Sequence, residues 1–152
     1  MISIRNILYA TDFSPYSNQA YFHAVALAEK YDAGLVILHV AGVSENGNRD
    51  KWRDQLEQIR PVNPSIRVRH VLLVGEPADE ILRFAGESRV DLIVVGTHGR
   101  TGLERLLMGS IAEKVLRGAA CSVLVVKMPK PVAVPERMEE TSVLGPAPAT
   151  GI

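Results

Sequence analysis

The chain has 152 residues, the length of one domain, and at that size roughly 70% of the unfolded surface can be buried, so no disulfide or structural metal is required. Hydrophobic residues make up 47% and charged residues 22%, as in ordinary globular proteins. Lys plus Arg and Asp plus Glu number 17 each, so the basic excess typical of nucleic-acid-binding proteins is missing.

The sequence lacks the features expected of a secreted or membrane protein. Its first residues do not have the basic-then-apolar order of a signal peptide, and no apolar run approaches the ~20 residues that cross a bilayer. The single cysteine, Cys121, cannot form an internal disulfide and lies in an apolar run, where a core residue is the ordinary interpretation and a reactive thiol the alternative. We expect a cytoplasmic protein without membrane or nucleic-acid partners.

Short apolar segments rich in β-branched residues predict strands that are buried on both faces. There are five: Ile4–Ala10, Leu35–Val40, Val68–Val74, Leu92–Val95 and Ser122–Lys127. Helical patterns lie between them and begin at Ser14-Pro15, before Trp52, at Pro77 and near Ser110, the second ending at Arg60 ahead of a proline. Strands that alternate with helices predict an α/β fold, a doubly wound parallel sheet with helices on both faces.

The composition changes at Met128. The last 25 residues contain five prolines and little apolar periodicity, so they cannot bury enough surface to offset their ordering entropy. We therefore expect a domain over residues 1–127 and a disordered tail over 128–152. A passive extension is the ordinary interpretation of such a tail, and a partner-binding segment is the alternative.

A glycine-rich segment follows the fourth predicted strand, with glycines at 96, 99, 102 and 109. Glycine allows successive backbone amides to point into one concavity, and a helix N-terminus at Ser110 would favour an anion there. The segment thus predicts a phosphate-binding loop, although it contains neither GxxxxGKS/T nor GxGxxG. A competing interpretation is that Ser110 and Glu113 form a capping box for the helix itself.

In an open parallel sheet, ligands bind at the carboxyl ends of the strands where the strand order reverses. The residues after the first and fourth strands are therefore candidates for a binding site. Asp12, directly after the first strand, has an alternative role as a turn residue or helix cap, and Thr11 as part of the same turn. His98 and Arg100, on the glycine-rich segment, either contact a phosphate or face solvent.

The spacing Gly96-x2-Gly99-x9-Gly109-Ser110 matches G-x2-G-x9-G-S/T, which marks the ATP-binding branch of the universal stress protein family. The chain resembles this family from residue 1 to about 127, through the segments at 9–14, 39–40, 75–77 and 122–126. The resemblance implies a five-stranded sheet of order 3-2-1-4-5 that holds ATP across strands one and four.

By this resemblance, Asp12 would accept hydrogen bonds from the ribose and Val40 would meet adenine through its backbone. Gly96 would lie beneath the ribose and phosphates, while Gly99, Gly109 and Ser110 would hold the phosphates. The full set of expected nucleotide-binding residues is Ala10, Thr11, Asp12, Val40, Gly96, Thr97, His98, Gly99, Arg100, Gly109, Ser110 and Ile111.

The sequence also suggests what the site does. No general base and no loop lysine stand beside the expected γ-phosphate, so we expect ATP binding with slow or no hydrolysis, with Asp12 as a possible Mg²⁺ ligand. The alternatives are an ATPase or adenylate-transferring enzyme in the same pocket, and a nucleotide-free interaction module. The resemblance further implies a homodimer through strand 122–127, unless the C-terminal tail covers that edge.

Overall fold

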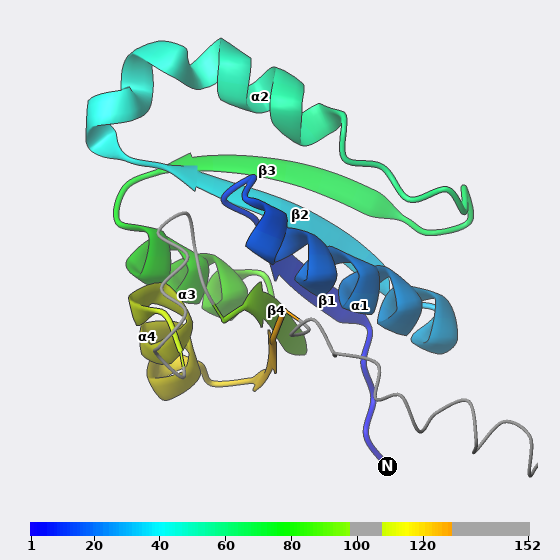
Figure 1. The fold of residues 1–152 in the computed structure, drawn as a ribbon. Helices are drawn as coiled ribbons and strands as arrows, with labels where there is room; N and C mark the ends of the chain where they lie inside the picture. Colours follow the sequence, from blue (N-terminus) through cyan, green and yellow to red (C-terminus); the bar gives the residue numbers. More distant parts are fainter. Residues whose placement is uncertain (98–107, 129–152) are drawn as a thin grey trace, which may run out of the picture.

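Five parallel strands form the centre of the fold, in the order β3-β2-β1-β4-β5 (Figure 1). The computed structural model describes residues 1–97 and 108–128. Of the tail expected over residues 128–152, all but Met128 therefore lies outside the described residues. The predicted parallel sheet and its order are both confirmed. The strands are β1 Asn6–Ala10, β2 Gly34–Ala41, β3 Val68–Val74, β4 Leu92–Gly96 and β5 Ser122–Val126.

Helices follow the strands in the expected alternation. They are α1 Pro15–Tyr31, α2 Arg49–Glu57, α3 Pro77–Glu87 and α4 Ser110–Gly118, with a 3₁₀ helix, η1, at Val43–Asn48. The helix α2 ends before the predicted Arg60, because Ile59 N donates to Leu56 O in a tighter i,i−3 turn. No pattern in the sequence predicted η1, which contains no buried residue and so shows no apolar period. None of the helices in the described residues has the length and apolar character that a bilayer crossing requires.

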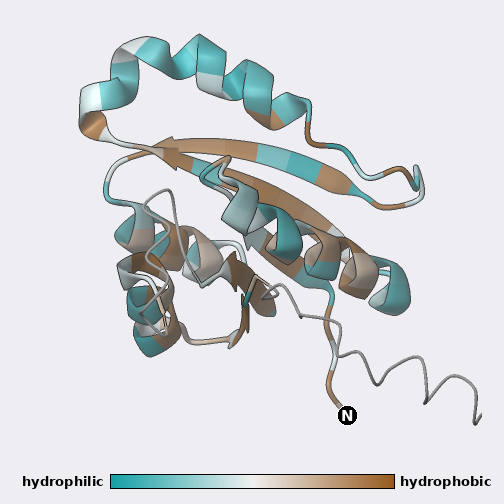
Figure 2. Ribbon diagram, viewed as in Figure 1, coloured by the Kyte–Doolittle hydropathy of each residue, from teal (hydrophilic) through white to brown (hydrophobic). Residues whose placement is uncertain are grey.

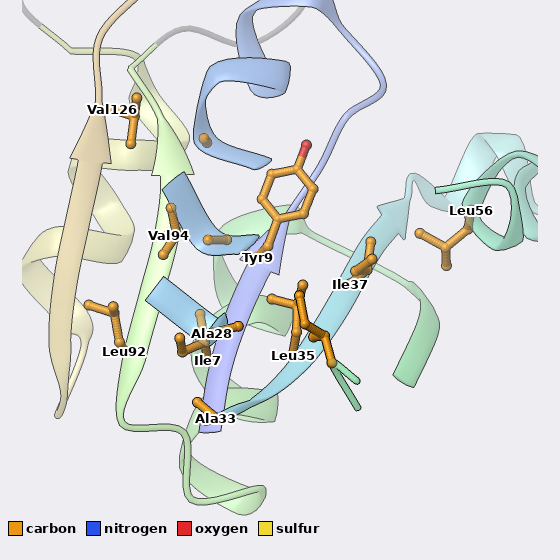
Figure 3. Close-up of a cluster of buried hydrophobic side chains, with 13 residues drawn as sticks. Ile7, Tyr9, Ala28, Ala33, Leu35, Ile37, Leu56, Leu92, Val94 and Val126 are labelled. Carbon is orange, nitrogen blue, oxygen red and sulfur yellow. The ribbon is translucent and has the colours of Figure 1, made fainter. Parts of the chain in front are cut away.

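Each face of the sheet carries its own hydrophobic core. Along β1 the side chains alternate, so Ile7 and Tyr9 lie on the face covered by α1 and α2, and Leu8 lies on the face covered by α3 and α4. Figure 3 shows the first of these cores, with Leu56 reaching the sheet from the end of α2. The helix α2 is otherwise largely hydrophilic (Figure 2), and Leu56 is its one buried residue.

Backbone conformation fixes two of the junctions near the carboxyl ends of the strands. Ser14 is the N-cap of α1 and Pro15 its first residue, as predicted, but the Ser14 hydroxyl makes no cap hydrogen bond. The β3–α3 junction requires glycine, because Gly75 has φ +151° and a Cβ there would lie 2.9 Å from Glu80 Cγ. These junctions bring the starts of α1 and α3 to the same edge of the sheet.

Candidate functional site

A cavity of about 380 Å³ opens at the carboxyl ends of β1, β2 and β4. This is the edge at which the strand order reverses between β1 and β4, the usual place for a ligand in an open parallel sheet. Its volume falls in the range of small-molecule sites, roughly 300–1,000 Å³. The walls are formed by Ala10, Thr11, Asp12, Ser17, Leu38, His39, Val40, Gly42, Glu45, Pro77, Ile81, Val95, Gly96, Thr97, Gly109, Ser110, Ile111 and Ala112.

The cavity brings together the site residues that the sequence predicted, as far as the structure describes them. Nine of the twelve line its walls: Ala10, Thr11, Asp12, Val40, Gly96, Thr97, Gly109, Ser110 and Ile111. The other three, His98, Gly99 and Arg100, lie outside the described residues. Segments about one hundred residues apart in the sequence therefore share one concave surface.

The turn after β1 is built from short side-chain to backbone hydrogen bonds. Phe13 N donates to Thr11 Oγ1 at 3.0 Å, and Ser14 N donates to Asp12 Oδ1 at 2.9 Å. Asp12 therefore has the turn role that the sequence offered as an alternative, and the residue also lines the cavity. The turn fixes the position of this carboxylate before any ligand binds.

An aromatic stack holds the same turn in a conformation that few large residues adopt. Phe13 has φ +64°, in the left-handed region that is rare for bulky side chains. Its ring lies 4.4 Å from that of His39 and 5.7 Å from that of Trp52, centroid to centroid, and is nearly parallel to Trp52. Contacts with β2 and α2 thus stabilise the strained residue, and no local sequence pattern predicts such an arrangement.

A buried hydrogen-bond network continues from the turn into α1. Ser17 Oγ donates to Ser14 O at 2.8 Å, so Thr11 Oγ1 is the donor in its 3.1 Å bond to Ser17 Oγ. Tyr9 OH donates to Ser17 O at 3.0 Å, and burial raises the pKa of the Tyr9 phenol, which keeps it a neutral donor. His39 Nδ1 carries a proton, because it lies 2.7 Å from the carbonyl oxygen of Thr11, which can only accept.

At the end of β2, a backbone edge that is not paired with β1 faces the cavity. The register of β1 with β2 ends where Ala10 lies beside Leu38. In a parallel strand, alternate residues direct both N–H and C=O to the same neighbour. Ala41 faces β3, since its carbonyl accepts from Gly75 N at 2.9 Å, so Val40 faces the side that β1 has left. Val40 therefore offers one donor and one acceptor, side by side, to the cavity.

The opposite wall of the cavity is the N-terminus of α4. Gly109 is the N-cap, with φ −70° and ψ 160°, and its N–H donates to Thr97 O at the end of β4. Glu113 N is the first amide with an intrahelical acceptor, Gly109 O, so the amides of residues 110–112 have none. The predicted capping box is wrong, because Ser110 is the first helical residue and the cap position belongs to a glycine.

Comparison with known proteins agrees with this architecture. The sequence model of the universal stress protein family matches residues 3–127. The chain belongs to the universal stress protein family. It is 36% identical to universal stress protein MJ0531 of Methanocaldococcus jannaschii over 142 residues, which cover 83% of this chain and 84% of that one.

Solved structures show the same fold. The structure of MJ0577 from Methanocaldococcus jannaschii has a TM-score of 0.72 and 28% identity, covering 85% of this chain and 99% of its own. A universal stress protein in complex with cAMP has a TM-score of 0.64 and 24% identity, covering 82% and 98%. The described part of this chain thus has the fold of its family.

The charges on the cavity wall of this universal stress protein are unusual for an anion site. Among the described residues, the wall contains two carboxylates, Asp12 and Glu45, and no lysine or arginine. The described residues also contain no cluster of three or more His, Cys, Asp or Glu that could hold a metal ion. Among the described wall residues, the groups that favour an anion are therefore the N-terminal amides and the dipole of α4.

Several wall residues were missed from the sequence, and Glu45 is the most informative. Its Oε2 accepts from Gly42 N at 3.2 Å, which holds the carboxylate against the chain that leaves β2. An acidic residue shortly after the second strand was a signal that sequence reasoning did not use. Ser17 was missed because it lies inside α1, where polar residues usually face solvent.

Proposed function

We propose that this universal stress protein binds an adenine nucleotide, ATP, in the cavity and hydrolyses it slowly or not at all. One observation carries the proposal: the cavity joins the bare edge of Val40 at one end to the free amides of α4 at the other. A nucleotide has the matching order, with a flat base, a polar sugar and a polyphosphate. The end of β1, with Asp12, lies between Val40 and the amides of α4.

The β2 end suits adenine. Val40, Pro77 and Ile81 contribute apolar surface there, against which a flat ring can pack. The Val40 N–H would donate to adenine N1, and the Val40 C=O would accept from the 6-amino group. Guanine and hypoxanthine carry N1–H and O6 instead. Their N1–H would face the Val40 N–H and their O6 would face the Val40 C=O, which leaves these buried groups unpaired.

The α4 end suits phosphates. The amides of residues 110–112 and the Ser110 hydroxyl would donate to phosphate oxygens, and Gly109 offers no side chain to block their approach. Gly96, at the end of β4, would lie beneath the ribose and phosphates, and Asp12 would accept from the ribose hydroxyls. We include Ala10, Thr11, Thr97 and Ile111 in the site as wall residues, and His98, Gly99 and Arg100 as further phosphate contacts.

The same walls support binding without efficient turnover. Phosphoryl transfer depends on cations or donors that stabilise the transferring charge, and the proposed site contains no lysine and one arginine, Arg100. Mg²⁺ would be held chiefly by the phosphate oxygens, with Asp12 as one further ligand. An enzyme with real ATPase or adenylate-transfer activity would need groups beyond these.

The experiment is to purify the protein, denature it and identify any released nucleotide, then to measure binding by calorimetry and turnover with Mg²⁺. Because a family member is known in complex with cAMP, the titrations compare ATP, AMP and cAMP. We expect ATP to bind best, with turnover far slower than the median enzyme rate of about 10 s⁻¹. Rapid turnover would favour the enzyme alternative, and no binding of any nucleotide would leave only the interaction module.

We further propose a cytoplasmic homodimer, with residues 1–127 as the nucleotide-binding domain. Among the described strands β5 pairs with β4 alone, and its residues Val123 to Val125 are only partly buried. Such an edge favours pairing with a second copy. Light scattering on the purified chain is expected to give twice the 16.6 kDa of one protomer. A monomer that dimerises only after residues 128–152 are removed would show that the tail covers this edge.

A further inference from the structure

We infer that His39 is a positioning residue for the nucleotide site, because its imidazole holds the Thr11 carbonyl away from Val40 N–H and so keeps the edge that would read adenine open. The inference rests on the proposed nucleotide site and adds to it the residue that keeps the base end accessible. The evidence is the pattern of hydrogen bonds at the point where β1 and β2 separate.

The ladder between β1 and β2 stops one bond short of Val40. Thr11 N donates to Leu38 O at 2.8 Å, which extends the pairing of Ala10 with Leu38 by one bond. In a regular parallel ladder the Thr11 carbonyl would next accept from Val40 N–H. No backbone bond joins these two groups in the described part of the chain, and the Thr11 carbonyl accepts from His39 Nδ1 at 2.7 Å. The imidazole therefore replaces the last donor of the ladder.

The two donors lie in different directions from Thr11. Val40 N–H lies in the plane of the sheet, whereas the His39 side chain projects from the face that α1 and α2 cover. On that face the imidazole ring lies 4.4 Å from the Phe13 ring and 5.2 Å from the Trp52 ring, centroid to centroid. A carbonyl that accepts from this imidazole is directed out of the plane of the sheet, so Val40 N–H stays open to the cavity.

Burial and the turn after β1 hold this arrangement. His39 is 2% exposed, so water does not compete for its bond to the Thr11 carbonyl. The Thr11 hydroxyl accepts from Phe13 N at 3.0 Å and donates to Ser17 Oγ at 3.1 Å, which ties the side chain of the same residue to the turn and to α1. Without the imidazole the buried carbonyl would lose its donor, and turning into the plane of the sheet toward Val40 N–H would restore a hydrogen bond. Loss of the imidazole would thereby close the edge to adenine.

The test uses His39→Phe, which keeps an aromatic ring beside Phe13 and removes the Nδ1 donor. Hydrogen exchange of the Val40 amide is measured by NMR in the protein without nucleotide. We expect this exchange to slow by about three- to tenfold in the variant, as for the gain of one hydrogen bond, whereas a substitution that only loosened the packing would speed it. ATP and adenosine are expected to bind about three- to tenfold more weakly and by the same factor, because either base must first break the new bond.

The matched control is His70→Phe on β3, which removes a similar bond outside the cavity wall, since His70 Nε2 lies 2.8 Å from Ile59 O. This variant is expected to leave both the exchange of Val40 and the affinity for adenosine unchanged. Unchanged or faster exchange of Val40 in folded His39→Phe, or an unchanged affinity for adenosine, overturns the inference while the nucleotide site stands.

The wild-type protein decides the question if His39→Phe does not fold. The inference requires the Val40 amide to exchange faster than that of Leu38, which faces β1 where the two strands are still paired. Equal protection of the two amides overturns it. A wild-type protein that binds neither ATP nor adenosine refutes the proposed function, and the exchange of Val40 still decides whether His39 keeps the edge open.

Discussion

Gly109→Val is the perturbation that tests most directly whether α4 holds the phosphates. The backbone of Gly109, at φ −70° and ψ 160°, lies in the extended region that valine adopts readily. Its N–H can still donate to Thr97 O, so the tie between α4 and β4 is kept. The substitution therefore adds a branched side chain at the mouth of the amide cluster with little strain on the backbone.

The expected magnitude follows from what the branched side chain displaces. A phosphate that loses even one charge-assisted hydrogen bond to the amides of residues 110–112 loses about 1.5–3 kcal/mol, which corresponds to a rise in Kd of roughly 10- to 150-fold. Valine is also a poorer N-cap than glycine, so the free energy of unfolding is expected to fall by up to about 1 kcal/mol. The loss of affinity therefore exceeds the loss of stability.

Calorimetry with ATP and with adenosine separates the phosphate end of the site from the base end. Adenosine, which has no phosphate, is expected to keep its affinity within about twofold in Gly109→Val, and thermal unfolding reports the stability. The matched control is Gly86→Val, on an exposed position of α3 where an added Cβ meets no atom within 4 Å. Retained ATP affinity in Gly109→Val, or equal losses for ATP and adenosine, would refute the assignment of α4 as the phosphate site.

Two predictions concern the scaffold. Leu56→Ala is expected to lower the free energy of unfolding by about 2–4 kcal/mol, because Leu56 is 1% exposed and is the one buried residue of α2. Urea titrations measure this loss. A loss under about 1 kcal/mol would show that α2 packs weakly. Burial raises the pKa of Tyr9, so the folded state holds its proton more tightly than the unfolded state, and this contribution to stability is complete below the unfolded pKa of about 10 and is lost as the pH rises above it. Denaturation curves between pH 9 and 11 are expected to show a smaller decline in Tyr9→Phe than in the wild type, and identical declines would contradict the assignment.

Much of the fold could be predicted from the sequence, because it depends on local chemistry. The β-branched runs gave the strands to within about two residues, because a strand buried on both faces needs apolar side chains at nearly every position. The starts of α1 and α3 were marked by Pro15 and Pro77, which need no N–H at the first helical position. The end of α2 was misplaced because a 3₁₀-type turn at Ile59 ends the helix ahead of the proline.

The candidate site also contains parts that the sequence predicted and parts that it did not. The glycine spacing pointed to Gly96 and Gly109, and the topology rule pointed to Asp12, since both depend on local chain properties and general sheet geometry. The capping-box pattern at Ser110 was misleading, because two helix starts one residue apart share nearly the same sequence and the bond from Gly109 N to Thr97 O selects between them.

The sequence by itself determined the order of strands and helices, the glycine-rich segment and the family to which the chain belongs, because each depends on residue types at fixed spacing. Only the tertiary structure decided that β1 turns away at Asp12 and leaves the Val40 edge bare, that aromatic contacts hold Phe13 at positive φ, and that Glu45 returns to that edge. These features depend on contacts between segments distant in the sequence. The free energies of these contacts are set by packing, which no local sequence pattern predicts.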